Sequence, residues 1–500
     1  MGADLKNLCE FHGMNQLVRE PTHDKYLLDL VCTDIPKSTV TVLPQIADHN
    51  SVLTRLPLTE VLEKHVKREV WILAKADWKQ LEKQLHEYDW TQLHNGSAED
   101  ALKYFLQVLW LHLIRHIPRR EIDDVKRSHG WLTETSKEAI RKKNDAEGTA
   151  RFATESTNCA ETLAAEHAKY VQEVKKKMAN LPRGRKQWWR INNELMRRKA
   201  NLASIPTLKE DGKWLSDSKA KADAFARTFD AKSKLSEEVV DTPFIGNPDE
   251  VLTEVVVIRS RTTKQLLKKL DESKATGSDM ISAAILKRLS DCLGIPFTIV
   301  VRRLFHEACW PSVWKFHLIC PIFKRGSAFM PGNYRGVHLT TVLSKVAEKL
   351  IGMHFVPFLQ RTAFGPNQWA FTPRLSCRDL VAMLMMSFIL AVCLGKKIGG
   401  FLNDISGAFD RVNKEILLGK LHEYDVGEQI LAFLDSYLAP RIAKVVVQGE
   451  RSEEIILENT VVQGVVLGPP LWNSFWGDVR HPAKSTGGRE AKSANDLNVF

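Results

Sequence analysis

FLNDISGAFDRV, residues 401–412, is the stretch that decides the fold of this chain. A short apolar run leads into Asp404, and a small-residue turn then precedes Ala408, Phe409 and Asp410. This pattern predicts a strand that carries an acidic side chain at its end and is followed by a helix. An acidic residue at a strand end is common, so its meaning depends on the motifs around it.

A second motif lies upstream of this strand. Residues 316–323 predict a strand that runs into Lys324, and a loop rich in Pro and Gly then leads to Arg335 and to a helix from about Thr341. Two cations on a hairpin that faces a carboxylate-bearing strand form a candidate triphosphate site, because Lys and Arg neutralise phosphate oxygens.

Before this hairpin, residues 271–289 predict a turn at Gly277 and then an amphipathic helix. Its expected N-cap is Ser278 or Asp279.

Two more motifs lie downstream. In the segment VVQGVVLGPPL, an apolar run ends at Gln463 and Gly464, and a helix opens at the prolines. A glycine at such a point permits close approach of another backbone or of a flat ligand. The segment SANDLNVF predicts a β-hairpin with Asn495 and Asp496 at its tip.

The composition indicates a globular chain with polyanionic partners. Its 500 residues are 44% hydrophobic, enough for two or three domains. The formal net charge is +11, which favours nucleic acid through counterion release. Residues 103–200 hold 22 Lys and Arg against 12 Asp and Glu, so the basic surplus is local.

Cysteine usage and hydropathy bear on the compartment. The eight cysteines form no CxxC pair, so the sequence indicates neither a zinc module nor a disulfide framework. The N-terminus lacks the apolar core of a signal peptide. The longest apolar run, residues 380–394, is short for a membrane span and predicts a buried helix. We expect an intracellular protein, nuclear or cytoplasmic, with no membrane partner.

Residues 61–236 read as a helical, basic linker region, and residues 237–254 as a linker. Tryptophans recur in amphipathic segments such as DWKQLEKQLHEYDW. We expect the apolar faces of these segments to pack on one another. Residues 183–190 place cations among aromatic residues, a mixture that can neutralise phosphates and stack on bases. A solvated helical face with its Trp residues in the core explains the same pattern equally well.

Residues 1–60 show strand-like runs at 26–32, 40–43 and 52–56. Asp29, Asp48 and His49 lie at or beside these runs. An adjacent Asp-His pair can serve phosphodiester cleavage, although a simple turn also explains it.

In their order, the motifs KATGSD, WKFHLICPIFKRG with NYRGVHLT, LNDISGAFDRV, VVQGVVLGPPL and SANDLNVF resemble the fingers and palm of non-LTR (LINE-type) retrotransposon reverse transcriptases. The resemblance implies an α+β fold over residues 255–500, with fingers and an incomplete palm and without the thumb, since the sequence stops within the last hairpin. It implies an RNA-directed DNA polymerase that acts on an RNA template, a DNA primer and deoxynucleotides. The oligomeric state stays open.

The N-terminal segment fits the same family. It resembles the C-terminal end of the endonuclease/exonuclease/phosphatase domain that precedes such reverse transcriptases, with Asp29, Asp48 and His49 at the matching positions and Ala47 where Ser is usual. Some sixty residues cannot rebuild that two-sheet core, so we expect a small β-rich remnant without nuclease activity. The nuclease-like start disfavours a group II intron maturase.

The resemblance also implies roles for the nucleotide-binding residues. Lys324 and Arg335 would hold the β- and γ-phosphates, and Phe409 would close over the sugar. Gln463 and Gly464 would pack near the templating base pair.

The metal-binding residues show a departure from the family. Two Mg²⁺ ions are the expected cofactor, and the motif match assigns them to Asp404, the backbone carbonyl of Ile405, and Asp496. The family has Asp-Asp in the last motif, whereas Asn495 takes the first of these positions here. A neutral amide removes a full negative charge, so we expect polymerase activity to be impaired or absent.

Two other functions stay open. One is a non-catalytic nucleic-acid-binding remnant of the element that uses the basic residues 103–200 and the fingers. The other is a degenerate product that folds poorly because it exposes apolar strand surface.

Overall fold

The computed structural model describes residues 5, 9, 14–35, 37–45, 48–57, 67–123, 131–181, 188–189, 191–192, 205–235, 256–365, 367–405, 407–459, 461–479 and 490–499. It divides into two compact units, Met1–Val66 and Lys67–Phe500. The linker expected at residues 237–254 lies outside the described part. So does most of the segment 183–190, which places cations among aromatic residues.

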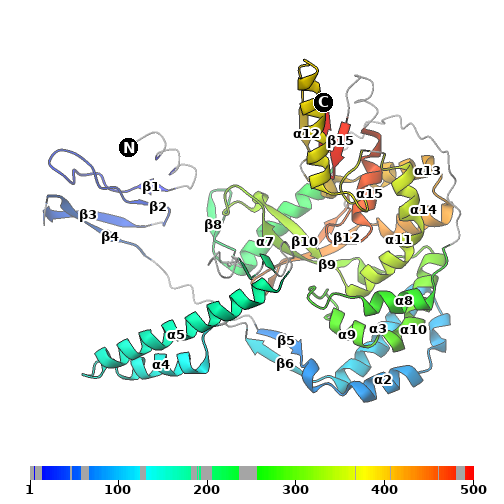
Figure 1. Ribbon diagram of the computed structural model, residues 1–500, viewed down its shortest axis with the longest axis horizontal. Helices are drawn as coiled ribbons and strands as arrows, with labels where there is room; N and C mark the ends of the chain where they lie inside the picture. Colours follow the sequence, from blue (N-terminus) through cyan, green and yellow to red (C-terminus); the bar gives the residue numbers. More distant parts are fainter. Residues whose placement is uncertain are drawn as a thin grey trace. The chain divides into compact units, whose positions relative to one another are not determined.

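The first unit is built from two antiparallel strand pairs (Figure 1). β1 (Asn15–Gln16) pairs with β2 (Cys32–Thr33), and β3 (Thr39–Gln45) pairs with β4 (Asn50–Arg55). The runs at 40–43 and 52–56 therefore fall largely within strands, as predicted.

The strand expected at residues 26–32 is wrong, because only Cys32 of this run is in a strand. The Oγ1 atom of Thr22 accepts hydrogen bonds from the backbone N–H groups of Leu28 and Asp29, at 3.1 and 3.0 Å. This local side-chain bonding competes with a strand ladder.

The second unit begins with helices whose caps are readable in the sequence. Asp77 caps α2 (Trp78–Glu87), and Ser97 and Asp100 form a capping box on α3 (Ala98–His116). As expected, their apolar faces pack together, and they also pack on α10 (Ser290–His306) in one large buried core.

The other helices and strands of the N-terminal half are β5 (Lys67–Trp71), η1 (Leu73–Lys75), η2 (Thr91–His94), β6 (Arg119–Asp123), α4 (Glu134–Asp145), α5 (Phe152–Ala179), β7 (Leu208–Glu210), β8 (Lys213–Leu215), α7 (Ser218–Ser233), α8 (Ser260–Lys268) and α9 (Ala283–Arg288). β5 pairs with β6 and β7 pairs with β8, both antiparallel.

The larger sheet positions the two cations. Its central strand β9 (Phe316–Phe323) pairs antiparallel with β10 (Tyr334–Leu339) and parallel with β12 (Arg441–Val447). The hairpin of β9 and β10 thus carries Lys324 just after one strand and Arg335 near the start of the next. β13 (Glu450–Arg451) and β14 (Ile455–Leu457) both pair with β12.

A smaller sheet carries the acidic residues. β16 (Asp496–Val499) lies between β11 (Phe401–Asp404) and β15 (Glu490–Ser493), and both pairings are antiparallel. The strand ending in Asp404 and the hairpin at Asn495 are therefore present as predicted. A 3-10 turn, η5 (Ala408–Arg411), and then helix α13 (Lys414–Glu423) follow β11.

The remaining elements are η3 (Ser312–Trp314), η4 (Pro331–Asn333), α11 (Val342–Thr362), α12 (Cys377–Cys393), α14 (Glu428–Tyr437), α15 (Gly468–Phe475) and η6 (Gly477–Val479). Thr341 caps α11, and α15 opens at the predicted glycine and prolines.

Gly277 explains why the KATGSD turn lies against α11. A Cβ atom at this position would lie 2.6 Å from the backbone N of Thr341, far inside van der Waals contact. Only a glycine permits this close approach.

The helix after this turn starts later than predicted. α9 begins at Ala283 and its cap is Ser282, not Ser278 or Asp279. The Asp279 carboxylate instead accepts the backbone N–H of Ile281 within the turn, at 3.2 Å.

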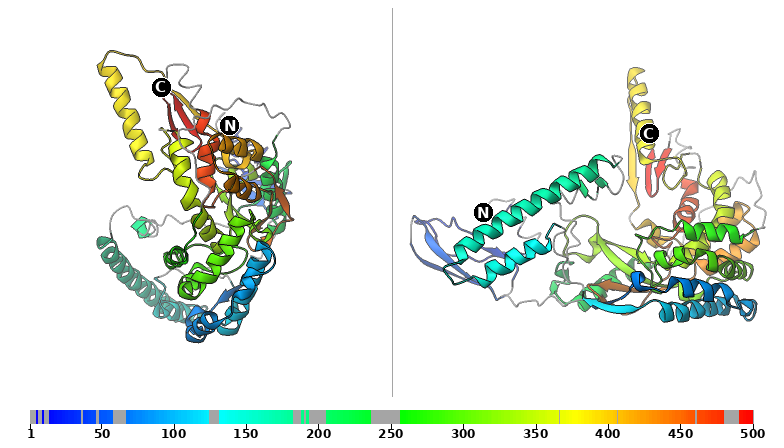
Figure 2. Two further views of the ribbon diagram at one scale, coloured as in Figure 1. Left: turned by 90° about the vertical axis from the view of Figure 1, so that its right-hand side faces the viewer. Right: turned by 60° about the horizontal axis from the view of Figure 1, so that its bottom comes forward.

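The apolar run at residues 380–394 forms a helix, but the prediction of a buried helix is wrong. Within α12 only Leu380 is buried, and Met386 is 72% exposed. The ribbon of this helix, drawn in yellow, extends away from the helices of the large core (Figure 2). Among the described residues, few side chains cover this helix. Composition alone cannot tell a buried apolar helix from an uncovered one, because it does not specify what packs on the helix.

None of the described helices is both long and apolar enough to cross a membrane.

Candidate nucleotide-binding site

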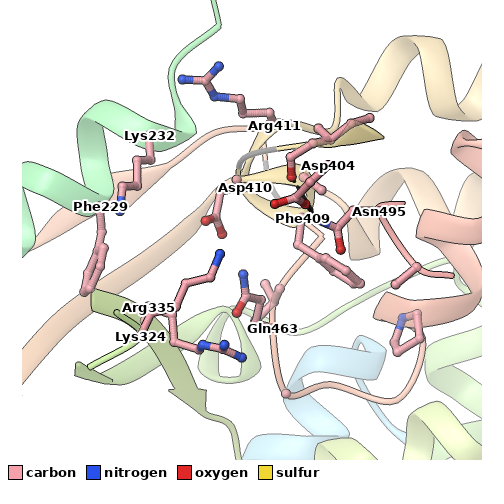
Figure 3. A pocket seen from close by; sticks show the side chains of 18 of the residues that line it. Phe229, Lys232, Lys324, Arg335, Asp404, Phe409, Asp410, Arg411, Gln463 and Asn495 are labelled. Atoms are coloured by element: carbon pink, nitrogen blue, oxygen red, sulfur yellow. Dashed lines mark hydrogen bonds between the residues drawn. The ribbon is translucent and has the colours of Figure 1, made fainter. Parts of the chain in front are cut away.

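One open cavity of about 670 Å³ lies between the two sheets (Figure 3). It brings together the nine residues that the sequence assigned to nucleotide and metal binding: Lys324, Arg335, Asp404, Ile405, Phe409, Gln463, Gly464, Asn495 and Asp496. These residues come from five separate segments of the chain.

The acidic side of the cavity is formed by β11 and β16. Asp404 and Asp496 are directly opposite each other in the antiparallel ladder, an arrangement in which like charges repel. Burial raises the pKa of Asp496, repulsion from Asp404 raises it further, and Lys324 lowers it. The two carboxylates therefore form a cation-attracting pair.

Asn495 is turned toward this pair. Its Nδ2 atom donates to Oδ1 of Asp404 at 2.5 Å and to the carbonyl oxygen of Ile405 at 3.0 Å. The backbone N–H of Ile405 donates in return to the carbonyl oxygen of Asn495, at 3.2 Å. The amide thus occupies two of the oxygen atoms that the family resemblance assigned to the metal.

The carboxylates and the Ile405 carbonyl are hard oxygen donors of the kind that Mg²⁺ prefers. Mg²⁺ is commonly held by one or two carboxylates together with substrate phosphates, and this donor set fits one such ion. Within the described part of the chain, no group of three or more His, Cys, Asp or Glu side chains could hold a metal by itself.

The cationic side of the cavity is a braced hairpin. The backbone N–H of Lys324 donates to the carbonyl oxygen of Asn333 at 3.0 Å, and the Asn333 side chain donates to the carbonyl oxygen of Ser327 at 2.9 Å. Hydrogen bonds within the loop between β9 and β10 therefore fix its conformation, which holds Lys324 and Arg335 at one edge of the cavity.

An aromatic stack forms the floor near Phe409. Its ring stacks on Trp472 of α15, with centroids 5.5 Å apart, and meets the ring of Phe371 edge to face at 6.2 Å. Trp472 also donates its Nε1–H to the carbonyl oxygen of Ala494, at 3.0 Å. One tryptophan thus supports both Phe409 and the hairpin tip that carries Asn495.

The loop with Gln463 and Gly464 is fixed from two sides. The backbone N–H of His338 donates to the carbonyl oxygen of Gln463 at 3.2 Å. Gly464 has φ +104°, and a Cβ atom there would lie 3.1 Å from the carbonyl oxygen of His338. Both facts explain why a glycine follows Gln463.

Farther along the same loop, the carboxylate of Glu348 accepts the backbone N–H groups of Val466 and Leu467, at 2.6 and 3.0 Å. Glu348 is buried, and burial raises its pKa. This acid therefore anchors the loop from the core side.

Sequence reasoning missed several residues that line or support the cavity: Phe229, Lys232, Phe371, Asp410, Arg411 and Trp472, together with Glu348 behind the loop. A signal for the first two was available, since Phe225, Phe229 and Lys232 follow the four- and three-residue spacing of one helical face. Nothing in the sequence linked that face to a strand more than eighty residues away.

The first unit brings its own predicted residues together. Nδ1 of His49 and Oδ2 of Asp29 are 2.7 Å apart. This hydrogen bond raises the pKa of His49 and lowers that of Asp29, and Asp48 raises the pKa of His49 further. The ring of His23 lies 4.8 Å from that of His49.

Comparison with known proteins shows what part of the chain is similar to. Residues 322–490, about a third of the chain, match the family model described as "Reverse transcriptase (RNA-dependent DNA polymerase)", so this segment is similar to domains of that class. It is related to the RNA-directed DNA polymerases of non-LTR retrotransposons. A template and a primer of nucleic acid, and a divalent metal, are the normal requirements of the class.

Three relatives from Drosophila melanogaster are representative. The chain is 24% identical over 304 residues to "Probable RNA-directed DNA polymerase from transposon BS", covering 59% of this chain and 33% of that protein. It is 29% identical over 262 residues to the X-element polymerase, covering 52% and 27%. It is 25% identical over 303 residues to "RNA-directed DNA polymerase from mobile element jockey", covering 58% and 32%. The matched part spans about a third of each relative.

Proposed function

We propose that this chain is built for template-directed deoxynucleotide transfer, in which a DNA primer on an RNA template attacks an incoming nucleotide. The observation that carries the proposal is the single cavity, which joins a carboxylate pair, two cations on a hairpin, and an aromatic floor. In this proposal β9 and β10 belong to the fingers and the sheet of β11, β16 and β15 to the palm.

Each side of the cavity takes one part of the nucleotide. Lys324 and Arg335 neutralise the β- and γ-phosphates by charge-assisted hydrogen bonds. Phe409, held flat by Trp472, lies against the sugar and collides with a ribose 2′-hydroxyl. Gln463 and Gly464 lie beside the templating pair.

Asp404, Asp496 and the Ile405 carbonyl would hold Mg²⁺, which supplies electrostatic stabilisation of the attacking and leaving oxygens when bound. We infer that this copy is impaired, because Asn495 removes one negative charge and its amide hydrogen-bonds Asp404.

Primer extension by the full chain on an RNA template, with Mg²⁺ or Mn²⁺, tests both parts. Weak, metal-dependent extension that D404N abolishes is the expected result. Robust extension would overturn the inference of impairment. The absence of any deoxynucleotide binding would overturn the proposed function itself.

A second candidate function is nucleic-acid binding without synthesis. Its support is the local excess of Lys and Arg in residues 103–200. Binding of an RNA–DNA hybrid over a salt series, measured beside extension, separates the two candidates. Tight binding with a steep salt dependence but no extension favours the second.

For the first unit, we propose a nuclease-related segment that retains the Asp29–His49 pair but does not itself cleave DNA. Incubation of the full chain with supercoiled DNA and Mg²⁺ checks this, and metal-dependent nicking lost in H49A would contradict it. A nuclear or cytoplasmic location follows from the proposed substrates and can be checked by imaging a tagged chain.

A further inference from the structure

We propose that Lys232, on helix α7, is a third cation of the triphosphate site. The inference rests on the proposed function and extends it to a helix that precedes the matched reverse transcriptase segment by about ninety residues.

Helix α7 is packed firmly enough to position a side chain. Phe225 and Phe229 lie in a buried cluster with Ile319 of β9, Tyr334 of β10 and Val445 of β12. The helix therefore shares a core with the strands that carry the two predicted phosphate ligands (Figure 1).

Lys232 extends from this helix into the cavity (Figure 3). Its Nζ lies 3.3 Å from the carbonyl oxygen of Gly332, on the β9–β10 connection, and 3.4 Å from that of Tyr334, the first residue of β10. It also lies 5.6 Å from the centroid of the Phe229 ring. Lys232 thus sits at the same edge of the cavity as the hairpin with Lys324 and Arg335.

The charges around Lys232 favour an anionic ligand. Burial lowers its pKa, Asp410 raises it, and Lys324 and Arg411 lower it. Four cations, Lys232, Lys324, Arg335 and Arg411, line the cavity, together with the carboxylates of Asp404, Asp410 and Asp496. Of the three acids, Asp410 is the one whose charge acts on Lys232. Like charges that line one small cavity repel one another, and a polyphosphate relieves this repulsion. A nucleoside triphosphate is therefore the ligand class that fits.

The test is calorimetric binding of dTTP and dTMP to the full chain with Mg²⁺, which requires no catalysis. K232Q should weaken dTTP binding by about tenfold, the loss expected for one charge-assisted phosphate contact. It should leave dTMP binding nearly unchanged, and K232R should restore dTTP binding. The matched control is K234Q, because Lys234 lies two residues away and is paired with Asp230 at 2.8 Å.

Lys232 could instead serve only to hold the hairpin through its two carbonyl contacts. In that case K232Q would lower the melting temperature and weaken dTTP and dTMP equally, which would overturn the proposal. Wild-type dTTP affinity in K232Q would overturn it as well. If K324Q and R335Q also bind dTTP like the wild type, the proposed triphosphate site fails and Lys232 with it. If K232Q alone binds dTTP like the wild type, while K324Q and R335Q bind it more weakly, the proposed function stands and only the role of Lys232 fails.

Discussion

The side-chain amide of Asn495 donates a hydrogen bond to the carboxylate of Asp404, across the end of the β11–β16 ladder. An amide N–H and a metal ion compete for the same carboxylate oxygen. In this chain Asn495 therefore supplies a hydrogen bond to the Asp404 carboxylate without any bound ion. An acidic residue at position 495 would repel Asp404 unless a cation lay between the two carboxylates.

The first prediction concerns this pair. N495D should strengthen Mg²⁺ binding and raise primer extension by at least tenfold, because it restores a charged oxygen ligand. Without metal, the same variant should melt at a lower temperature than the wild type, since three carboxylates then repel one another. Thermal melts with Mg²⁺ and with EDTA, beside extension assays, measure both effects. N498D serves as the control, because Asn498 donates to the carbonyl oxygen of Ala491 within the ladder. Equal metal responses in N495D and the wild type would contradict the prediction.

The second prediction concerns Gly464. G464A should destabilise the fold by about 1 to 3 kcal/mol, because alanine is strained at φ +104° and its Cβ would crowd the carbonyl oxygen of His338. The displaced loop should also weaken deoxynucleotide binding. Denaturant unfolding and calorimetry check these effects. The control is G419A in helix α13, where a Cβ meets no atom within 4 Å. That variant should be stabilised by about 0.5 to 1 kcal/mol. Equal stability of the two variants would count against the strain argument.

The third prediction concerns the anchor behind that loop. E348A leaves the backbone N–H groups of Val466 and Leu467 buried without their acceptor, and should cost about 2 to 5 kcal/mol of unfolding free energy. E348Q retains an acceptor oxygen and should lose much less. Urea titrations of the two variants provide the comparison. A loss of equal size in both would show that the charge, and not the acceptor, holds the loop.

The fourth prediction is a pH dependence set by Asp279. Burial raises the pKa of this carboxyl from 3.8 to about 6. Between these values the folded chain binds more protons at Asp279 than the unfolded chain, so the contribution of this group to stability falls as pH rises from about 4 to 6.

D279N removes this titration and can still accept the N–H of Ile281. Its unfolding free energy relative to the wild type should grow between pH 4 and 6 by about 1 to 3 kcal/mol and then level off. Unfolding at a series of pH values measures this. A difference between the two proteins that does not change with pH would refute the assignment.

Much of the fold could be predicted from local pattern. The strand at 316–323, the helix capped by Thr341, the strand ending in Asp404 and the last hairpin all lie where the sequence placed them. Helix caps, turns and the hydrophobic periods of strands and helices depend on residues that are close together in the sequence. A single sequence is therefore enough to predict them.

Predictions from local sequence pattern were wrong where long-range contacts or side-chain hydrogen bonds determine the structure. The strand expected at 26–32 is replaced by hydrogen bonds to Thr22, and α9 starts at Ala283, with Ser282 as its cap, because Asp279 is used within the turn. The apolar run that forms α12 is exposed, because burial depends on which other segments cover a helix and not on the composition of that helix.

The sequence by itself determined the order of the motifs and the chemistry of the residues within them, including Asn495 in place of an acid. Only the tertiary structure decided that Trp472 supports Phe409, that Glu348 holds the loop after Gly464, and that Lys232 enters the nucleotide cavity. The physical reason is that these relationships join side chains from segments distant in the sequence. Packing of a shared core brings such segments together, and no local periodicity encodes which ones meet.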